Sequence, residues 1–313
     1  AFNALGLLYK KQNKEILAEN YFKKAMASDS NFAYAYYNLG NIASQRNEND
    51  AAIKYYAKAI EKKPDYKEAM IELGVLYENK KQINLAEKFY RRAIIADSNF
   101  LLAWYDLGLL YENKYLYDSA EKYFRKVLQI NPRYSQAFSS LGYLYDQKGR
   151  PDLSEKHYMQ ALQCDSTNIY AYYNLGLLYK NRKQYSDAEK MLLQVVHFNP
   201  GYVYGYNLLG LLYKEQNQYA PAEKYFLLAV EKNPGFVYSW YNLGLLYKEQ
   251  EKSEAAASSF KKAIAADSTY LFAYDELGLL LLGPMNKPAE AVGFFEKLVK
   301  QQPDSGRHYY NLA

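Results

Sequence analysis

The stretch "YNLGLLYKEQ", at 241–250, is written almost identically at several other places in the chain. "YNLGLLYKNR" occupies 173–182 and "LLGLLYKEQN" occupies 208–217. The Leu-Gly pair inside these stretches begins at positions 5, 39, 73, 107, 141, 175, 209, 243 and 277, so every step is 34 residues. The next copy, Leu312-Ala313, follows after 35 residues and indicates one inserted residue. A fixed period of this length predicts a repeat architecture.

Each unit carries two groups of apolar residues at helical spacing. In the unit that starts at Val237, these are Trp240, Leu243, Gly244 and Tyr247, followed by Ala256, Phe260 and Ala263. Steps of three and four place each group on one face of a helix. Polar segments such as "NQYAP" separate the two groups, and endings such as "NPGY" and "DSTY" are typical of helix stops and turns. We therefore expect two antiparallel helices in each unit.

This pattern resembles the tetratricopeptide repeat, a signature of large, small and aromatic residues over 34 positions. The resemblance covers the whole chain and implies an all-α fold, a right-handed α-solenoid superhelix of 34-residue helix-turn-helix units. Two departures are local: Ser154 replaces the usual Ala, and Gly283-Pro284 predicts an early end of one first helix. We expect a single array over 1–313, with a partial repeat at 1–32, full repeats at 33–66, 67–100, 101–134, 135–168, 169–202, 203–236, 237–270 and 271–305, and the start of a tenth at 306–313.

The composition limits what kind of protein this is. Half of the residues are apolar, 37 are Tyr, and the formal net charge is +5. This charge does not favour nucleic-acid binding, which needs Lys and Arg concentrated on one face. The single cysteine, Cys164, excludes an internal disulfide, which favours the cytoplasm slightly and leaves the compartment open. No apolar run of about 18 residues predicts a membrane span. Both ends fall inside the repeat pattern, so we expect a fragment without its natural termini.

The sequence contains no motif for catalysis or metal binding. His157, His197 and His308 are isolated, and Cys164 has no partner in sequence. Cys-x-x-Cys, His-Glu-x-x-His and Gly-rich phosphate loops are absent. Carboxylates follow the repeat and form no odd pair. We therefore expect no enzymatic activity, no metal site and no cofactor.

The first helix of each unit has two faces with different roles. In the unit from Val237, Leu243, Gly244 and Tyr247 pack against the second helix, and Gly244 lets two backbones approach closely. Positions 2, 5, 6, 9 and 12 of the unit lie on the opposite side. The resemblance implies that this side lines a concave groove. Because the fold signature leaves these positions free, they carry the functional information.

The predicted groove is aromatic. Position 2 supplies Tyr34, Tyr170, Tyr204, Tyr238 and Phe272, and position 5 supplies Tyr37, Tyr105, Tyr173, Asn207 and Tyr241. These rings can contact a ligand, or they can pack against the equivalent helix of the next unit. Both interpretations can hold together, because a tyrosine can bury its ring and still present its hydroxyl.

Polar residues of the same face predict two further contacts. Asn38, Asn174 and Asn242 stand at position 6, where a carboxamide can donate to and accept from a peptide bond. This is similar to the asparagine ladder in the repeat region of O-GlcNAc transferases. Position 12 carries Lys180, Lys214 and Lys248, which would attract acidic partner residues. Alternatively, these lysines only complement the helix macrodipole.

The sequence thus predicts a non-catalytic scaffold that binds a partner peptide or protein in a concave groove, with acidic partner residues facing 180–248. One alternative is a regulatory or substrate-recruiting arm of a larger enzyme, or of a secretion or assembly complex. Nucleic-acid binding is a second alternative, which acidic residues such as Glu78 and Glu112 disfavour. Self-association, with another copy in the groove or at an open end, is a third.

Overall fold

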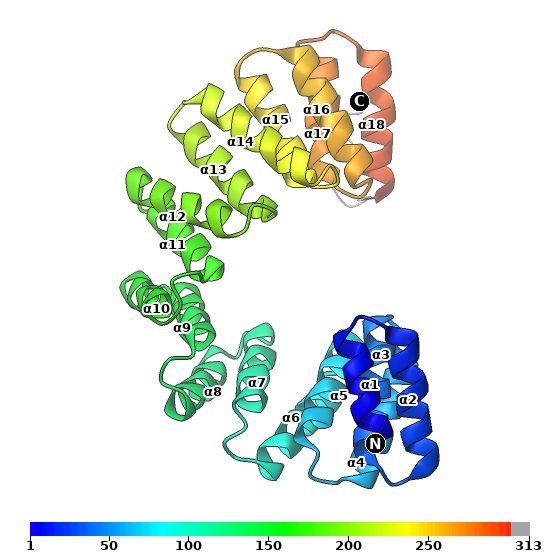
Figure 1. Cartoon of the computed structure of the whole chain (residues 1–313). Coiled ribbons are helices and arrows are strands. Elements are labelled where there is room, and N and C mark those ends of the chain that lie inside the picture. The colour runs from blue at the N-terminus through cyan, green and yellow to red at the C-terminus, as the bar shows by residue number, and fades with distance from the viewer. Residues whose placement is uncertain (302–313) are drawn as a thin grey trace. The chain divides into compact units, whose positions relative to one another are not determined.

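The computed structural model describes residues 1–301, and this part of the chain consists of helices joined by short turns (Figure 1). The chain forms two compact units, Ala1–Cys164 (unit 1) and Asp165–Ala313 (unit 2), and each is treated by itself below. The predicted start of a tenth repeat at 306–313, which includes His308, lies outside the described residues.

Unit 1 contains ten helices and the described part of unit 2 contains eight. Those of unit 1 are α1 (Phe2–Lys11), α2 (Glu15–Ser28), α3 (Ala33–Gln45), α4 (Asn49–Lys62), α5 (Lys67–Asn79), α6 (Ile83–Ala96), α7 (Leu101–Asn113), α8 (Tyr117–Ile130), α9 (Ser135–Gln147) and α10 (Pro151–Cys164). Those of unit 2 are α11 (Ile169–Asn181), α12 (Tyr185–Phe198), α13 (Val203–Glu215), α14 (Tyr219–Lys232), α15 (Val237–Glu249), α16 (Ser253–Ala266), α17 (Leu271–Leu282) and α18 (Pro288–Gln301).

The helices pack as consecutive pairs within each unit. The odd-numbered helix packs most extensively on the even-numbered helix that follows it, and each pair packs on the next. In unit 2, the first helix α13 also contacts the first helices α11 and α15. The predicted all-α solenoid of helix-turn-helix units is therefore confirmed. The limits of the individual repeats stay a prediction.

A left-handed residue ends the first helix of each pair. In the turn between α13 and α14, Asn217 has a φ of 58°, its N–H donates to the Lys214 carbonyl (2.9 Å), and the Gln218 N–H donates to the Tyr213 carbonyl (2.9 Å). These two bonds form a Schellman motif, which satisfies carbonyls that the helix leaves open. The equivalent positive-φ residues in the other turns are Asn13, Asn47, Lys81, Tyr115, Gly149, Lys183 and Glu251.

The last described pair departs from this pattern at the place that the sequence indicates. The helix α17 ends at Leu282, one residue earlier than the other first helices of unit 2, and Gly283 follows it. The left-handed residue is Asn286, one position later in its unit than Asn217 in its own. The inserted residue of the 35-residue step therefore lies in the turn between α17 and α18.

The glycine of each Leu-Gly pair makes room for one large side chain. A Cβ on Gly244 would lie 2.3 Å from the Phe260 ring, which is fully buried on α16. The close approach is thus between a backbone and a ring, and not between two backbones as the sequence interpretation has it. The same contact joins Gly6 to Phe22, Gly40 to Tyr56, Gly74 to Tyr90, Gly108 to Phe124, Gly142 to Tyr158, Gly176 to Leu192, Gly210 to Phe226 and Gly278 to Phe295.

Candidate functional site: an aromatic ladder in unit 2

Seven aromatic side chains of unit 2 form one continuous row, which we name the aromatic ladder. Its members, in order, are Tyr170, Tyr202, Tyr204, Phe236, Tyr238, Tyr270 and Phe272. Successive ring centroids are between 4.9 and 6.5 Å apart, and several pairs meet edge to face. Both the spacing and the geometry are those that aromatic pairs favour. The row joins four consecutive helix pairs.

Exposed and covered rings alternate along the ladder. The four outer rings are exposed to solvent: Tyr170 by 61%, Tyr204 by 47%, Tyr238 by 47% and Phe272 by 66%. The three rings between them are covered, since Phe236 is buried and Tyr202 and Tyr270 are half-buried. The covered rings hold the outer rings at fixed places, so the ladder presents apolar surface that is ordered before any ligand arrives.

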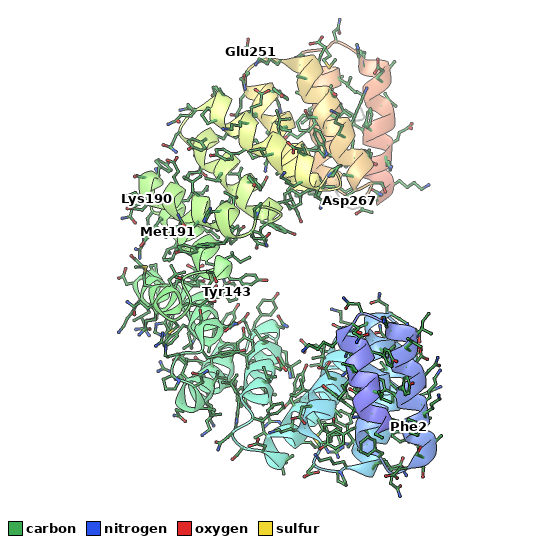
Figure 2. The ribbon with its side chains drawn as sticks, viewed as in Figure 1. Phe2, Tyr143, Lys190, Met191, Glu251 and Asp267 are labelled. Carbon is green, nitrogen blue, oxygen red and sulfur yellow. The ribbon has the colours of Figure 1, made fainter. Side chains whose placement is uncertain are left out.

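The repeat places three of the outer rings two positions after a covered ring. Phe236 is the residue immediately before α15, and Tyr238 is the second residue of that helix. Glu251 and Asp267 mark opposite ends of α16 (Figure 2), and Tyr270 follows Asp267, so the ladder lies at the Asp267 end. There the Asp267 carboxylate accepts hydrogen bonds from the Thr269 hydroxyl (2.7 Å) and backbone N–H (2.8 Å), which lower the pKa of Asp267 and fix the loop.

Two of the predicted groove tyrosines, Tyr173 and Tyr241, contact rings of the ladder but are not members of the row. The Tyr241 ring is 5.3 Å from Tyr270 and 5.8 Å from the buried Phe260. Burial raises the pKa of Tyr241 to about 12. Tyr173 lies 5.7 Å from Tyr202, and burial raises its pKa as well. These two rings contribute mainly to packing between neighbouring pairs.

The predicted asparagines have partners within the chain. The Asn207 carbonyl oxygen accepts from the Ser239 hydroxyl and from the Asn242 amide nitrogen, both at 2.9 Å. The Asn174 amide nitrogen donates to the Tyr170 carbonyl on its own helix (2.9 Å). Part of the hydrogen-bonding capacity that a peptide clamp needs is therefore already used.

The three predicted lysines are paired with carboxylates of the next helix pair. Lys214 contacts Glu249 at 2.7 Å and Lys248 contacts Glu276 at 2.6 Å. Lys180 makes the same kind of pair with Glu215. Each pair cancels one positive charge. Each of these lysines stands in the last turn of its helix, whereas the outer rings of the ladder stand in the first turn. Such partly exposed pairs contribute little to stability.

The predicted residues of unit 1 mostly pack inside the solenoid. Tyr34 is 45% exposed, but its hydroxyl accepts from Lys63 Nζ (3.2 Å) and its ring lies 5.2 Å from Tyr66. Tyr37 packs on the same Tyr66 ring, at 5.0 Å. Asn38 is buried and donates to the Asn3 carbonyl oxygen (3.0 Å).

Tyr105 completes the predicted residues of unit 1. Its ring lies 5.3 Å from Tyr134 and 5.6 Å from the buried Phe124. Burial raises the pKa of Tyr105 to about 12. No row comparable to the ladder of unit 2 joins it to Tyr34 or Tyr37 among the described ring contacts.

Unit 1 contains instead a group of partly buried carboxyl groups on α5 and α7. Burial raises the pKa of Asp106 to about 7, and Glu78 and Glu72 add to the shift by repulsion. Burial also raises the pKa of Glu112 to about 7, and its Oε2 is buried without a hydrogen-bond partner among the described residues. Glu78 accepts a bond from the Tyr90 hydroxyl (2.9 Å). Within residues 1–301, no group of three metal-ligating residues is close enough to hold an ion.

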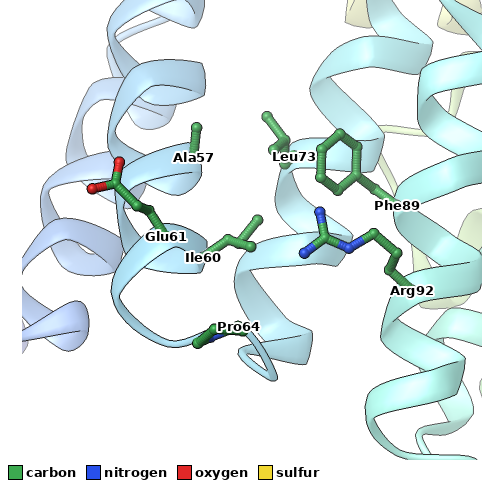
Figure 3. A pocket seen from close by; sticks show the side chains of 7 residues that line it. All are labelled: Ala57, Ile60, Glu61, Pro64, Leu73, Phe89 and Arg92. Atoms are coloured by element: carbon green, nitrogen blue, oxygen red, sulfur yellow. The ribbon is translucent and has the colours of Figure 1, made fainter.

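Unit 1 also has a shallow pocket of about 380 Å³ (Figure 3). It is lined by Ala57, Ile60, Glu61, Pro64, Leu73, Phe89 and Arg92. The lining comes from α4, α5, α6 and the loop after α4, and it includes none of the predicted site residues. With one acidic and one basic side chain over an apolar floor, it lacks the convergent polar groups of a small-molecule site.

The sequence analysis does not predict three members of the ladder as site residues. Tyr202, Phe236 and Tyr270 each precede a first helix, where the endings "NPGY", "NPGF" and "DSTY" were assigned to turns. The signal that reveals them is the 34-residue spacing itself, because an aromatic residue stands at this position in most units. The same position holds Phe32, Tyr66, Phe100 and Tyr134 in unit 1.

Comparisons with known families agree with this repeat pattern. A tetratricopeptide repeat model matches residues 3–66, 37–99 and 207–270, and further models of the same repeat match 101–134, 135–168, 157–190 and 272–305. The chain belongs to the tetratricopeptide repeat family. Proteins of this family bind protein partners and are typically non-catalytic, which supports a protein-interaction scaffold. No helix of the described chain has the length and apolar character needed to cross a bilayer.

Several solved structures share the fold. A tetratricopeptide repeat protein from Parabacteroides merdae ATCC 43184 matches with a TM-score of 0.61 and 18% identity, over 80% of this chain and 98% of that one. The pilF protein of Pseudomonas aeruginosa matches with a TM-score of 0.57 and 21% identity, over 67% and 95%. The APC/C hetero-tetramer Cut9-Hcn1 matches with a TM-score of 0.60 and 15% identity, over 96% and 59%. No curated protein matches the sequence.

Proposed function

We propose that unit 2 binds a segment of a partner protein along the aromatic ladder, and that the chain acts as a non-catalytic interaction scaffold. One observation carries the proposal: four exposed rings stand at the same repeat position and form a single row with the covered rings between them. A contiguous apolar surface on a soluble protein marks an interaction site. Aromatic side chains also provide most of the binding energy in many protein interfaces.

The other predicted residues take secondary roles in this proposal. The carbonyl oxygens of Asn174 and Asn242 would accept hydrogen bonds from the partner backbone, since their amide nitrogens donate within the chain. Lys180, Lys214 and Lys248 would contact acidic partner residues only by exchanging their present carboxylate partners. In unit 1, Tyr34 is the predicted residue whose exposure matches that of the ladder's outer rings.

The pairing of the predicted lysines supports a protein partner over a nucleic acid. Proteins that bind single strands combine stacking rings with a positively charged groove that follows the phosphates. Here the rings are present, but Lys214 and Lys248 already face Glu249 and Glu276. Lysines that are already paired with carboxylates give little attraction for a phosphate backbone.

Selection from a random library of 12-residue peptides displayed on phage tests the proposal. Isothermal titration calorimetry then compares the affinity of a selected peptide for the wild type and for Tyr170→Ala/Tyr204→Ala/Tyr238→Ala. Loss of three exposed rings is expected to weaken binding at least about tenfold, while the circular dichroism spectrum stays helical because the covered rings remain.

A matched control separates the ladder from exposed tyrosines in general. Tyr115 is 76% exposed in the turn between α7 and α8, far from the ladder in sequence. Tyr115→Ala is expected to leave the affinity unchanged. Equal affinity of wild type and triple variant would place the binding surface elsewhere and contradict the proposal.

A further inference from the structure

The chemistry of the ladder also indicates which kind of segment it binds. This inference rests on the proposed function. We propose that the ladder recognises a proline-rich segment in the polyproline II conformation. Two observations carry it: the spacing of the outer rings, and the free hydroxyl groups on three of them.

The spacing of the outer rings accommodates one turn of a polyproline II helix. Tyr204 and Tyr238 are 4.9 and 5.4 Å from the Phe236 ring between them. They are therefore separated by no more than roughly 10 Å, as expected for equivalent positions on packed helices. A polyproline II helix has three residues per turn and advances roughly 9 Å per turn. A residue at every third position can then meet each outer ring, whereas one side of a β-strand repeats after roughly 7 Å.

The covered rings limit the separations of the other outer rings in the same way. Tyr270 lies 5.8 Å from Tyr238 and 5.6 Å from Phe272, and Tyr202 lies 6.5 Å from Tyr170 and 5.6 Å from Tyr204. Four outer rings thus span three turns of the ligand, which corresponds to roughly ten residues. Proline rings suit such a surface, because aromatic-lined grooves are the common receptors of proline-rich segments.

The hydroxyl groups distinguish polyproline II from an α-helix, whose residues seven apart are also separated by roughly 10 Å. Among the described residues, no hydrogen-bond partner is found for the hydroxyls of Tyr170, Tyr204 and Tyr238. Each can donate one bond to a ligand carbonyl. In an α-helix those carbonyls are already bonded within the helix. In polyproline II they have no internal partner and point outward, so the three hydroxyls find acceptors only in the second case.

The conformation of a proline-rich segment is largely fixed before binding, which reduces the entropy lost on association.

Fluorescence anisotropy with labelled dodecaproline tests the inference directly. Two labelled peptides of the same length serve as references, a flexible Gly-Ser peptide and an alanine-based helical peptide. The ladder is expected to bind dodecaproline at least about tenfold more tightly than either reference. Equal or tighter binding of the helical or the flexible peptide would overturn the inference. So would preferential, salt-sensitive binding of a labelled oligothymidylate.

Variants of the ladder test the two contributions separately. Tyr204→Phe/Tyr238→Phe keeps both rings and removes both hydroxyls, and it is expected to weaken dodecaproline binding about tenfold. Tyr204→Ala/Tyr238→Ala removes the rings as well and should weaken it further. Tyr115→Ala is the control, since Tyr115 is 76% exposed in a turn of unit 1 outside the predicted groove, and it should change nothing. Circular dichroism verifies that each variant is folded.

The outcomes separate this inference from the function on which it rests. If phage-selected peptides without proline bind and depend on Tyr204 and Tyr238, the proposed function stands and the polyproline inference fails. If the phenylalanine variant binds dodecaproline as tightly as the wild type, the hydroxyls have no role and the inference fails likewise. If dodecaproline binds but the alanine variant binds it equally, the polyproline inference fails, and the phage-selected peptides decide the proposed function.

Discussion

At the residue scale, the large side chain that packs against it explains why a glycine recurs in each repeat. Gly244 lies against Phe260, and a methyl group at Gly244 would come within 2.3 Å of that buried ring. The chain has a contrasting glycine in the same kind of structure. Gly293 stands in the middle of α18, and a Cβ there would meet nothing within 4 Å. Alanine substitutions at Gly244 and Gly293 therefore distinguish the effect of crowding from the effect of helix propensity.

We expect Gly244→Ala to destabilise the protein and Gly293→Ala to stabilise it slightly. The first forces the Phe260 ring to move, which costs about 1–3 kcal/mol in a packed core. The second removes the backbone entropy cost of a helical glycine and gains about 0.5–1 kcal/mol. Urea unfolding followed by circular dichroism measures both. A Gly244→Ala midpoint at or above that of the wild type would contradict the crowding argument.

At the element scale, α7 places ionisable groups inside unit 1. Asp106 and Glu112 both have a pKa raised to about 7 by burial, from ordinary values of 3.8 and 4.5. Between about pH 4 and pH 7 the folded chain thus binds more protons at these groups than the unfolded chain. By linkage, their contribution to stability falls as the pH rises through this window.

We therefore expect unit 1 to be more stable at pH 5 than at pH 8 because of these two groups. Asp106→Asn/Glu112→Gln should raise the urea midpoint at pH 8 and remove much of the difference between the two pH values. The burial of His157 lowers its pKa and acts in the opposite direction, so the variant must be compared with the wild type at each pH. An unchanged pH dependence in the double variant would assign the effect to other groups.

At the scale of the whole molecule, the chain consists of two compact units, and the aromatic ladder lies entirely within unit 2. Each unit has its own buried residues, such as Tyr90 and Phe124 in unit 1 and Phe226 and Phe260 in unit 2. The stability of repeat proteins is approximately a sum over units and the interfaces between neighbouring units. A unit with several complete helix pairs should therefore fold on its own.

We expect residues 1–164 and 165–313, expressed separately, to be helical and to unfold cooperatively. Circular dichroism measures the helix content per residue, and urea titration measures cooperativity. The full chain at the same concentration is the control. A fragment that is soluble but shows no sigmoidal transition would mean that its core does not suffice for folding.

The sequence was enough to predict the repeat, the helix pairs and the face that packs, because these follow from spacing alone. The partners of individual side chains were not predictable in this way. Lys214 and Glu249 are 35 positions apart, and only the stacking of α13 on α15 shows that they meet. Phe236 was assigned to a turn because its neighbours are Gly and Pro, although its ring is a covered member of the ladder. Turn residues such as Lys81 and Tyr115 adopt positive φ without the glycine that propensity would predict.

The pairing of Lys180 with Glu215 and of Lys214 with Glu249 has a consequence for how such a chain can lengthen. Each bond joins the twelfth position of one repeat to the thirteenth position of the next. A gene segment encoding residues 203–236, copied in tandem, would bring both members of the bond in the correct places. The new junction would then repeat an existing one, so internal duplication could extend the array, and the row of exposed tyrosines with it, without any new interaction having to evolve.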